Sequence, residues 1–467
     1  MKVNLLDLVR QGKPLTFRQQ LWLTVSLSLP AMLSQISTIV MEYIDASMVG
    51  SLGANASASI GLVATTIWLF GGVCSSVTSG FAVQVAHRIG ASRNRSARSV
   101  LRQAIVSSLA FSCALGLVGV LISSRLPYWL GANEEIAADA SAYFLIFSAS
   151  VPLMELYFLA AAMLRSSGNI LVPSVLNVAA CALDVLMNFI FIFPSHIIGL
   201  GGLSITIPGF GLGVVGAAWG TTASFFISTS LMLGYLCFRS KELRLTHEKG
   251  SFKPRRATLR RAAGIGAPML LQHVVMCSAQ IMTTVIVAPL GTIAIAANSF
   301  GITAESLCYM PGYGISDAAV TLVGQSLGAG RRDLMKRFAF ITVGMGIVVM
   351  SLMGIVMYVF APVMMSILTP VEAVRTLGVS CLRIEAWAEP MFAASIVAYG
   401  VFVGTGKTFV PSLMNFASIW LVRVILAAIL APVYGLAGVW LAMCIELTFR
   451  GVIFLVRLWM KRNDLGH

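Results

Sequence analysis

Long apolar stretches recur along this chain from end to end, and they limit what it can fold into more than any other feature. A stretch of about 18 or more apolar residues is long enough to cross a bilayer as a helix. Charged residues make up only 11% of the chain, whereas soluble domains carry about 25%. The sequence therefore predicts an all-α membrane protein. We expect twelve transmembrane helices, at about residues 21–50, 58–85, 102–124, 141–163, 171–193, 213–238, 262–288, 297–323, 338–360, 378–403, 410–432 and 435–457.

The net charge of +14 is open to two interpretations. A strongly basic chain can bind nucleic acid, but here the Lys and Arg residues gather in short segments between the apolar spans. Such segments stay on the cytoplasmic side of a membrane, where anionic lipid headgroups attract them. Most of the 32 basic residues fall on the side that holds both termini. We therefore expect a multi-pass protein of the inner (plasma) membrane with cytoplasmic termini, with membrane lipids and not nucleic acid as partners.

Motifs for catalysis or cofactor binding are missing or out of context. The GxGxxG pattern at Gly211–Gly216 opens a membrane helix with no βαβ unit around it, so it indicates close packing and not dinucleotide binding. HExxH and GxSxG are absent, and the eight cysteines are scattered through apolar runs without a CxxC pair. We expect no enzyme activity, no cofactor and no metal site. The sequence also shows no ATPase domain, so if the chain transports a compound, we expect an ion gradient to drive that transport.

The chain matches itself when it is shifted by 238 residues. Under that shift Pro30 falls on Pro268 and Gly90 on Gly328, and further matches extend across five spans. Each repeat holds six spans, an even number, so the repeats are related by a pseudo-twofold axis along the membrane normal, with a cavity expected between them. The sequence predicts two six-helix lobes. The expected units are a first lobe at 1–238, a basic cytoplasmic linker at 239–261 and a second lobe at 262–467.

After the fifth span the shift falls to 222, because the first lobe has 16 extra residues within Pro194–Gly213. This uncharged segment is rich in Gly, Pro, Ile and Thr, which predicts a short external hairpin. The second lobe has no counterpart to it.

Acidic residues inside the spans indicate a function, because a charge at mid-helix raises the free energy of membrane insertion by roughly 2.5–3.5 kcal/mol. Two spans of the first lobe carry polar stripes, each along one helical face. On the first span the stripe is Gln35, Thr38, Glu42 and Asp45. On the fifth span it is Asn177, Cys181, Asp184 and Asn188. If the stripes face each other inside the lobe, their carboxylate and amide oxygens could hold a cation or a proton.

The second lobe lacks these acids. By the same shift, Asp45 corresponds to Thr283 and Asp184 to Val422. A purely architectural need would keep acids in both lobes, so an ion or proton site is favoured over hydrogen-bonded packing. Because burial disfavours a charged carboxylate, we hypothesise that Asp45 and Asp184 alternately hold and release protons, and that their charge sets the shape of the first lobe.

Two segments resemble the multidrug and toxic compound extrusion (MATE) family of cation antiporters, namely Asp45–Ala54 (DASMVGSLGA) and Glu305–Gly330 (ESLCYMPGYGISDAAVTLVGQSLGAG). With the six-plus-six repeat, the resemblance covers nearly the whole chain. It implies export of amphipathic organic cations in exchange for protons, or alternatively sodium, by alternating access between two V-shaped lobes. Members of the family carry an Asp on the first helix, which Asp45 matches. They also carry an Asn/Asp pair on the fifth, which Asp184 and Asn188 match with the two residue types exchanged.

Glu305 lies in the second of these segments, and its counterpart in the first lobe is Ile67. It is a candidate contact for a substrate cation or a proton, the alternative being a hydrogen bond to a neighbouring helix. The sodium-linked branch of the family usually has an acid on the seventh span, where this chain has Gln272 and His273. Both are kept as candidates for a substrate or second-lobe cation site, although a lone His is more often satisfied packing than a proton carrier.

The resemblance implies a multidrug exporter, which we expect to work as a monomer with Met and Phe side chains lining its cavity. Two other functions stay open. A lipid-linked oligosaccharide flippase of the same superfamily would usually have a more cationic cavity, and a membrane enzyme or receptor would not need the tandem repeat. One of the arginines inside the spans, Arg450, lies four residues from Glu446, which predicts a structural ion pair.

Overall fold

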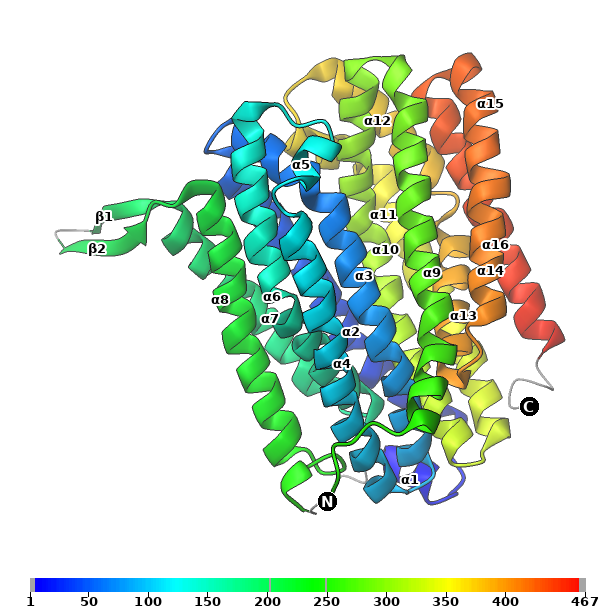
Figure 1. The fold of residues 1–467 in the computed structure, drawn as a ribbon. Helices are drawn as coiled ribbons and strands as arrows, with labels where there is room; N and C mark the ends of the chain where they lie inside the picture. Colours follow the sequence, from blue (N-terminus) through cyan, green and yellow to red (C-terminus); the bar gives the residue numbers. More distant parts are fainter. Residues whose placement is uncertain (1–4, 201–202, 248–249, 462–467) are drawn as a thin grey trace.

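The computed structural model describes residues 5–200, 203–247 and 250–461, and nearly all of them are helical (Figure 1). The six spans of the first lobe are α2 (Phe17–Gly50), α3 (Ala54–Gly90), α4 (Asn94–Ile122), α6 (Glu134–Ser166), α7 (Leu171–Ile192) and α8 (Gly213–Gly234). Two short helices, α1 (Leu5–Arg10) and α5 (Leu126–Trp129), accompany them. These helices confirm the first six predicted spans.

The second lobe holds six further spans. They are α9 (Arg256–Val287), α10 (Thr292–Gly328), α11 (Arg332–Leu368), α12 (Glu372–Glu385) with α13 (Glu389–Thr405), α14 (Phe409–Ala417) with α15 (Ile425–Tyr434), and α16 (Leu436–Met460). α9 begins inside the segment 239–261 that the sequence predicts as a linker. The prediction of an all-α membrane fold with twelve spans in two lobes is confirmed.

The tenth span, predicted as one helix over 378–403, is broken. α12 and α13 meet at a bend of 60°. Pro390 is the second residue of α13. Proline is well accommodated in the first turn of a helix, where its missing N–H needs no partner. The counterpart of Pro390 under the 238-residue shift, Pro152, lies inside the unbroken helix α6, so the proline alone does not dictate the break. The eleventh span, predicted over 410–432, widens into a π-helical turn at Ser418–Val424, a distortion that is frequent at functional sites.

Ten helices among the described residues are long and apolar enough to cross a membrane, and the bent α12–α13 pair makes an eleventh. The remaining span, α10, is 37 residues long but is too polar to qualify by composition. Its polar residues include Asn298, Glu305, Asp317 and Gln325. Large apolar side chains are exposed on the outside of the bundle, among them Leu117, Leu121, Ile281, Val348 and Ile355. Such a surface suits contact with lipid.

Two antiparallel strands connect α7 to α8. β1 (Pro194–Leu200) and β2 (Leu203–Phe210) form a ribbon that projects from the first lobe (Figure 1). Among the described residues this ribbon is the only β structure. It confirms the hairpin predicted within Pro194–Gly213 and accounts for the drop in the repeat offset.

The two lobes meet closely where α3 crosses α10. A side chain on Gly90 would collide with the carbonyl oxygen of Gln325, and one on Gly328 with the carbonyl oxygen of His87. The 238-residue shift relates Gly90 to Gly328 and His87 to Gln325. The crossing therefore obeys the pseudo-twofold symmetry that the repeat predicts.

α1 lies beside this crossing, and the guanidinium group of its Arg10 is hydrogen-bonded to residues of both lobes. Arg10 Nη2 donates to the Ser167 carbonyl oxygen at 2.7 Å, and Nε donates to Gln325 Oε1 at 3.2 Å. Arg10 Nη1 donates to Glu242 Oε1 at 2.8 Å. Ser167 belongs to the first lobe, Gln325 to the second, and Glu242 to the segment between them. Arg10 thus ties both lobes and their connection together at the end of the bundle that carries α1 (Figure 1).

Candidate functional site

A cavity of about 610 Å³ lies between the two lobes. Helices α2, α3, α6, α7 and α8 line one wall, and α9, α10, α13 and α16 line most of the other. Aromatic and methionine side chains supply much of its apolar surface: Met41, Tyr157, Phe158, Phe225, Met269, Met276, Tyr313, Phe392 and Tyr399. Methionine adapts to apolar surfaces of varied shape, and aromatic faces attract cations.

The polar centre of the first lobe consists of Asp45 on α2 with Asp184 and Asn188 on α7. Asn188 Nδ2 donates to Asp45 Oδ1 at 3.0 Å and to Asp184 Oδ2 at 3.1 Å. Asn188 is only 1% exposed. α8 can approach it because Gly220 has no side chain to collide with the Asn188 amide and backbone. The stripes predicted on the first and fifth spans therefore meet here.

The two carboxyl groups of this centre are joined through the Asn188 amide, which donates one hydrogen to each, and they are electrostatic neighbours. A direct hydrogen bond could form between two such groups only when one of them carries a hydrogen, because an ionised carboxylate can only accept. Two ionised carboxylates in contact repel each other. The centre can thus hold a proton, or a cation in its place, and losing it changes the force between α2 and α7.

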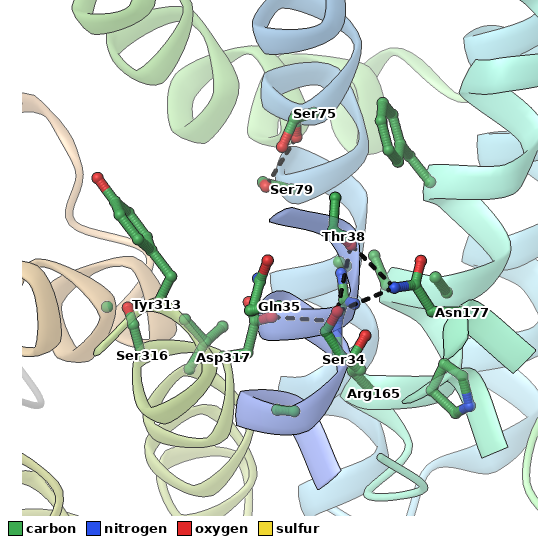
Figure 2. A pocket seen from close by; sticks show the side chains of 18 of the residues that line it. Ser34, Gln35, Thr38, Ser75, Ser79, Arg165, Asn177, Tyr313, Ser316 and Asp317 are labelled. Atoms are coloured by element: carbon green, nitrogen blue, oxygen red, sulfur yellow. Dashed lines mark hydrogen bonds and ion pairs between the residues drawn. The ribbon is translucent and has the colours of Figure 1, made fainter. Parts of the chain in front are cut away.

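The stripes stay connected through Asn177 of α7 (Figure 2). Asn177 Nδ2 donates to Thr38 Oγ1 at 3.1 Å and to the Ser34 carbonyl oxygen at 3.3 Å, both on α2. Tyr157 of α6 donates its hydroxyl hydrogen to Asn177 Oδ1 at 2.6 Å. Sequence reasoning selected Asn177 but missed Tyr157, because a single tyrosine in an apolar span forms no periodic pattern.

Gln35 and Glu42, the other two candidates on α2, line the central cavity together with Asp184. Glu42 precedes Asp45 by three residues and therefore lies on the same helical face. Its side chain is exposed. The Glu42 carboxyl group is thus open to a compound in the cavity, whereas the Asp45 group is engaged with α7.

The candidates in the second lobe are divided between two places. Gln272 and His273 line the central cavity. Ser412 Oγ donates to Gln272 Oε1 at 3.2 Å, and the His273 ring packs where a side chain on Gly72 of α3 would stand. Glu305 does not join them, because it is 5% exposed and lies away from the cavity wall.

Glu305 belongs instead to a buried acidic group at the bend of the tenth span. Its electrostatic neighbours include Glu385, which ends α12, and Glu389, which begins α13. Arg423 in the π-helical turn is the neighbouring cation. Both glutamates are 0% exposed, and among the described residues none of their carboxyl oxygens has a hydrogen-bond partner. Burial without partners is costly for such groups, and the sequence alone did not single them out as a site.

Glu446 of α16 forms ion pairs with two arginines. Arg423 Nη2 and Nε donate to Glu446 Oε2 at 2.6 and 2.9 Å, and Arg450 Nε lies 3.1 Å from Glu446 Oε1. Ser418 Oγ donates to Glu446 Oε1 at 2.6 Å. The predicted Glu446–Arg450 ion pair is confirmed. The ion pair between Arg423 and Glu446 was not predicted from the sequence, because Arg423 lies on a different helix.

A further ion pair joins the lobes at the wall of the cavity (Figure 2). Arg165 Nε, at the end of α6, lies 3.8 Å from Asp317 Oδ2 on α10. Thr321, one turn along α10, donates to the Arg165 carbonyl oxygen at 3.2 Å. Sequence reasoning treated Arg165 only as one of the basic residues that set topology, because nothing in the sequence pairs residues of different lobes.

Comparison with known proteins agrees with this architecture. The MatE family model matches residues 30–190 and 268–429, one range in each lobe, and the two ranges begin 238 residues apart. The probable multidrug resistance protein NorM of Thermotoga maritima is 25% identical over 94% of this chain and 93% of its own. NorM of Brucella suis is 27% identical over 96% and 94%. The multidrug resistance protein MdtK of Yersinia pestis is 22% identical over 94% and 95%.

Solved structures share the fold. A MATE structure in complex with MaL6 matches with a TM-score of 0.88 at 19% identity, over 99% of each chain. A MOP superfamily transporter from Pyrococcus furiosus matches with a TM-score of 0.88 at 19% identity, over 100% of each chain. An outward-facing MATE family transporter matches with a TM-score of 0.87 over 96% of each chain. At such identities the likeness establishes the fold alone.

Proposed function

The chain belongs to the MatE family of membrane transporters, and from that premise we propose that it is a secondary active antiporter that exports amphipathic organic cations in exchange for protons. The names of its relatives, multidrug resistance proteins, support drug efflux. The proposal places both termini in the cytoplasm, because the basic segments lie on their side of the membrane. Sodium is the alternative coupling ion.

The observation that carries the proposal is the contact of Asp45 and Asp184 through Asn188, which joins α2 to α7. With one proton bound, the two carboxyl groups attract each other through a hydrogen bond. Without it they repel, so α2 and α7 favour a different spacing. Proton binding therefore biases the shape of the first lobe.

Helix α2 carries Asp45, the proposed proton-binding group, and it also carries residues that line the cavity. Gln35 and Glu42 of α2 line the cavity, one to three turns from Asp45. A compound that prefers one position of α2 and a proton that prefers another must affect each other's binding, because both act on one equilibrium. That linkage is what an antiporter requires.

Amphipathic cations fit the cavity chemistry. Glu42 and Asp184 present carboxyl groups, and nearby Tyr157 and Phe225 present aromatic surface. A cation over an aromatic face gains roughly 0.5–2 kcal/mol, more when water is excluded. Anionic compounds would meet repulsion from the first-lobe carboxylates.

The test is ethidium export by the full chain in membrane vesicles, driven first by a pH gradient alone and then by a sodium gradient alone. We expect the pH gradient to suffice. Asp45→Asn should abolish that export, because an Asn cannot take up and release the proton. Thr283→Val is the matched control in the second lobe, since the Thr283 hydroxyl donates to the Ala279 carbonyl oxygen of its own helix at 2.9 Å.

Undiminished export by Asp45→Asn, at wild-type levels of protein in the membrane, would refute the proposed coupling site. Export driven only by sodium would replace the proton by sodium and leave the rest of the proposal standing. Export by neither gradient would remove antiport itself.

A further inference from the structure

The ion pair between Arg165 and Asp317 lies in the wall of the cavity, close to the end of the bundle that carries α1. Both side chains line the cavity and are about a third exposed, 31% for Arg165 and 32% for Asp317. Arg165 is two residues from Ser167, whose carbonyl oxygen accepts from Arg10 of α1. The pair thus lies close to the place where Arg10 joins the two lobes.

This pair is loose. Its atoms are 3.8 Å apart and both partners reach the cavity, and exposed ion pairs of that kind add little stability. By contrast, Arg423 lies 2.6 Å from Glu446, which is 0% exposed. A cation arriving in the cavity could replace Arg165 at Asp317 with little loss, whereas it could not reach Glu446.

The surroundings of Asp317 suit an organic cation. Tyr313 precedes it by one turn of α10, so an aromatic ring and a carboxylate lie on the same helical face. Gln35 of the adjacent helix α2 lies beside it (Figure 2). By the 238-residue shift, Asp317 corresponds to Ser79, which lines the cavity without a charge. The acid is therefore specific to the second lobe.

We propose that Asp317 is the subsite for the cationic group of the exported compound, and that the compound binds there by displacing Arg165. This inference rests on the proposed export of organic cations and adds where the charge is held. Because Arg165 and Asp317 belong to different lobes, each binding event removes a contact between the lobes. The cross-lobe bonds that remain nearby are those from Thr321 to the Arg165 carbonyl oxygen and from Gln325 to the Ser166 carbonyl oxygen.

Displacement has a consequence that a purely structural ion pair does not share. Removing Asp317 takes away the partner of the compound and weakens binding. Removing Arg165 takes away the competitor and strengthens binding. If the pair only held the lobes together, the two substitutions would act in the same direction.

The experiment measures the dissociation constant of tetraphenylphosphonium for the full chain in lipid nanodiscs, by calorimetry at one fixed pH. We expect Asp317→Asn to weaken binding about tenfold and Arg165→Gln to tighten it about threefold, with the double variant close to Asp317→Asn. Triphenylphosphine oxide, similar in aromatic bulk but uncharged, should bind all variants alike. Arg165→Gln carries the test alone if Asp317→Asn does not fold.

Asp333→Asn is the matched control, because Asp333 pairs with Arg331 at 3.4 Å outside the cavity wall, and its binding should equal that of the wild type. The inference is overturned if Asp317→Asn binds the cation as the wild type does, or if Arg165→Gln binds it more weakly. Either result leaves the antiport proposal intact, since that depends on Asp45 and Asp184. A wild-type protein that binds no cation would instead remove the proposed substrate class.

Discussion

The two lobes share one fold but treat their buried carboxyl groups differently. In the first lobe, Asp45 and Asp184 share hydrogen bonds with Asn188 beside the cavity. In the second, Glu385 and Glu389 are enclosed at the bend between α12 and α13, with no hydrogen-bond partner among the described residues. The duplicated backbone therefore does not dictate the chemistry inside it.

What the lobes have kept in common is packing. Gly90 and Gly328 make equivalent close approaches across the pseudo-twofold axis. The lobes differ in charge at equivalent positions, because the second lobe has Thr283 where the first lobe has Asp45. We expect the first lobe to respond to protons and the second to be held by fixed ion pairs. The four tests below examine that contrast, in order of their expected effect on the free energy of unfolding.

The largest effect is expected from Glu446→Gln in the second lobe. The change leaves the largely buried side chains of Arg423 and Arg450 without the carboxylate that pairs with both of them. Losing one partner of a buried ion pair costs about 3–5 kcal/mol. The measurement is the unfolding temperature of the purified protein in detergent, which should fall sharply.

Thr448→Val on the same helix is the control, because the Thr448 hydroxyl donates to the Cys444 carbonyl oxygen of its own helix at 2.8 Å. An unfolding temperature for Glu446→Gln equal to that of the control would show that the two arginines are compensated elsewhere. The second lobe would then not be held by these pairs.

The next effect concerns the symmetric crossing. Gly90→Ala and Gly328→Ala each add a methyl group where a carbonyl oxygen of the other lobe stands. Such overpacking costs about 1–3 kcal/mol, and the two costs should be equal within error if the lobes contribute alike. Gly344→Ala in α11 is the control, because nothing lies within 4 Å of the added atom. Clearly unequal costs would show that the two halves of the crossing differ in stiffness.

Much of the fold follows from the sequence because it depends on local patterns. Apolar length predicts the spans, the repeat predicts the lobes, and the four-residue spacing of Glu446 and Arg450 predicts their ion pair. Helical spacing also predicts that Asp45 and Asp184 lie on polar faces, although only the structure shows that Asn188 joins them.

The rest depends on contacts between distant segments. The break between α12 and α13 interrupts a stretch whose apolar composition is continuous, so composition alone does not reveal it. Arg165 and Asp317 come from different lobes, and no periodicity connects them. For the same reason, the enclosure of Glu389 by neighbouring helices is absent from any local pattern.

A smaller effect of opposite sign is expected from Glu389→Met. Methionine has a similar volume and no polar oxygen to leave without a partner. Removing a buried unpaired polar group should raise the free energy of unfolding by about 1–2 kcal/mol, which a rise in unfolding temperature would report. A fall would mean that a bound proton donor or cation pairs with Glu389 in the working protein, and the two lobes would then be more alike than the structure indicates.

The smallest effect on stability, with the largest effect on transport, is expected from Asp184→Asn. Asparagine has the same shape, and its amide can donate to Asp45 in place of the shared hydrogen, so the free energy of unfolding should change by no more than about 1 kcal/mol. The contact between α2 and α7 would then be permanent, because an amide does not lose its hydrogens in this pH range.

Ethidium export should fall to background and lose its dependence on pH, whereas Val422→Ala, at the corresponding place in the second lobe, should leave both unchanged. Export by Asp184→Asn with a normal pH profile would mean that the difference between the lobes is one of packing alone, since the first-lobe carboxyl group would then have no part in coupling.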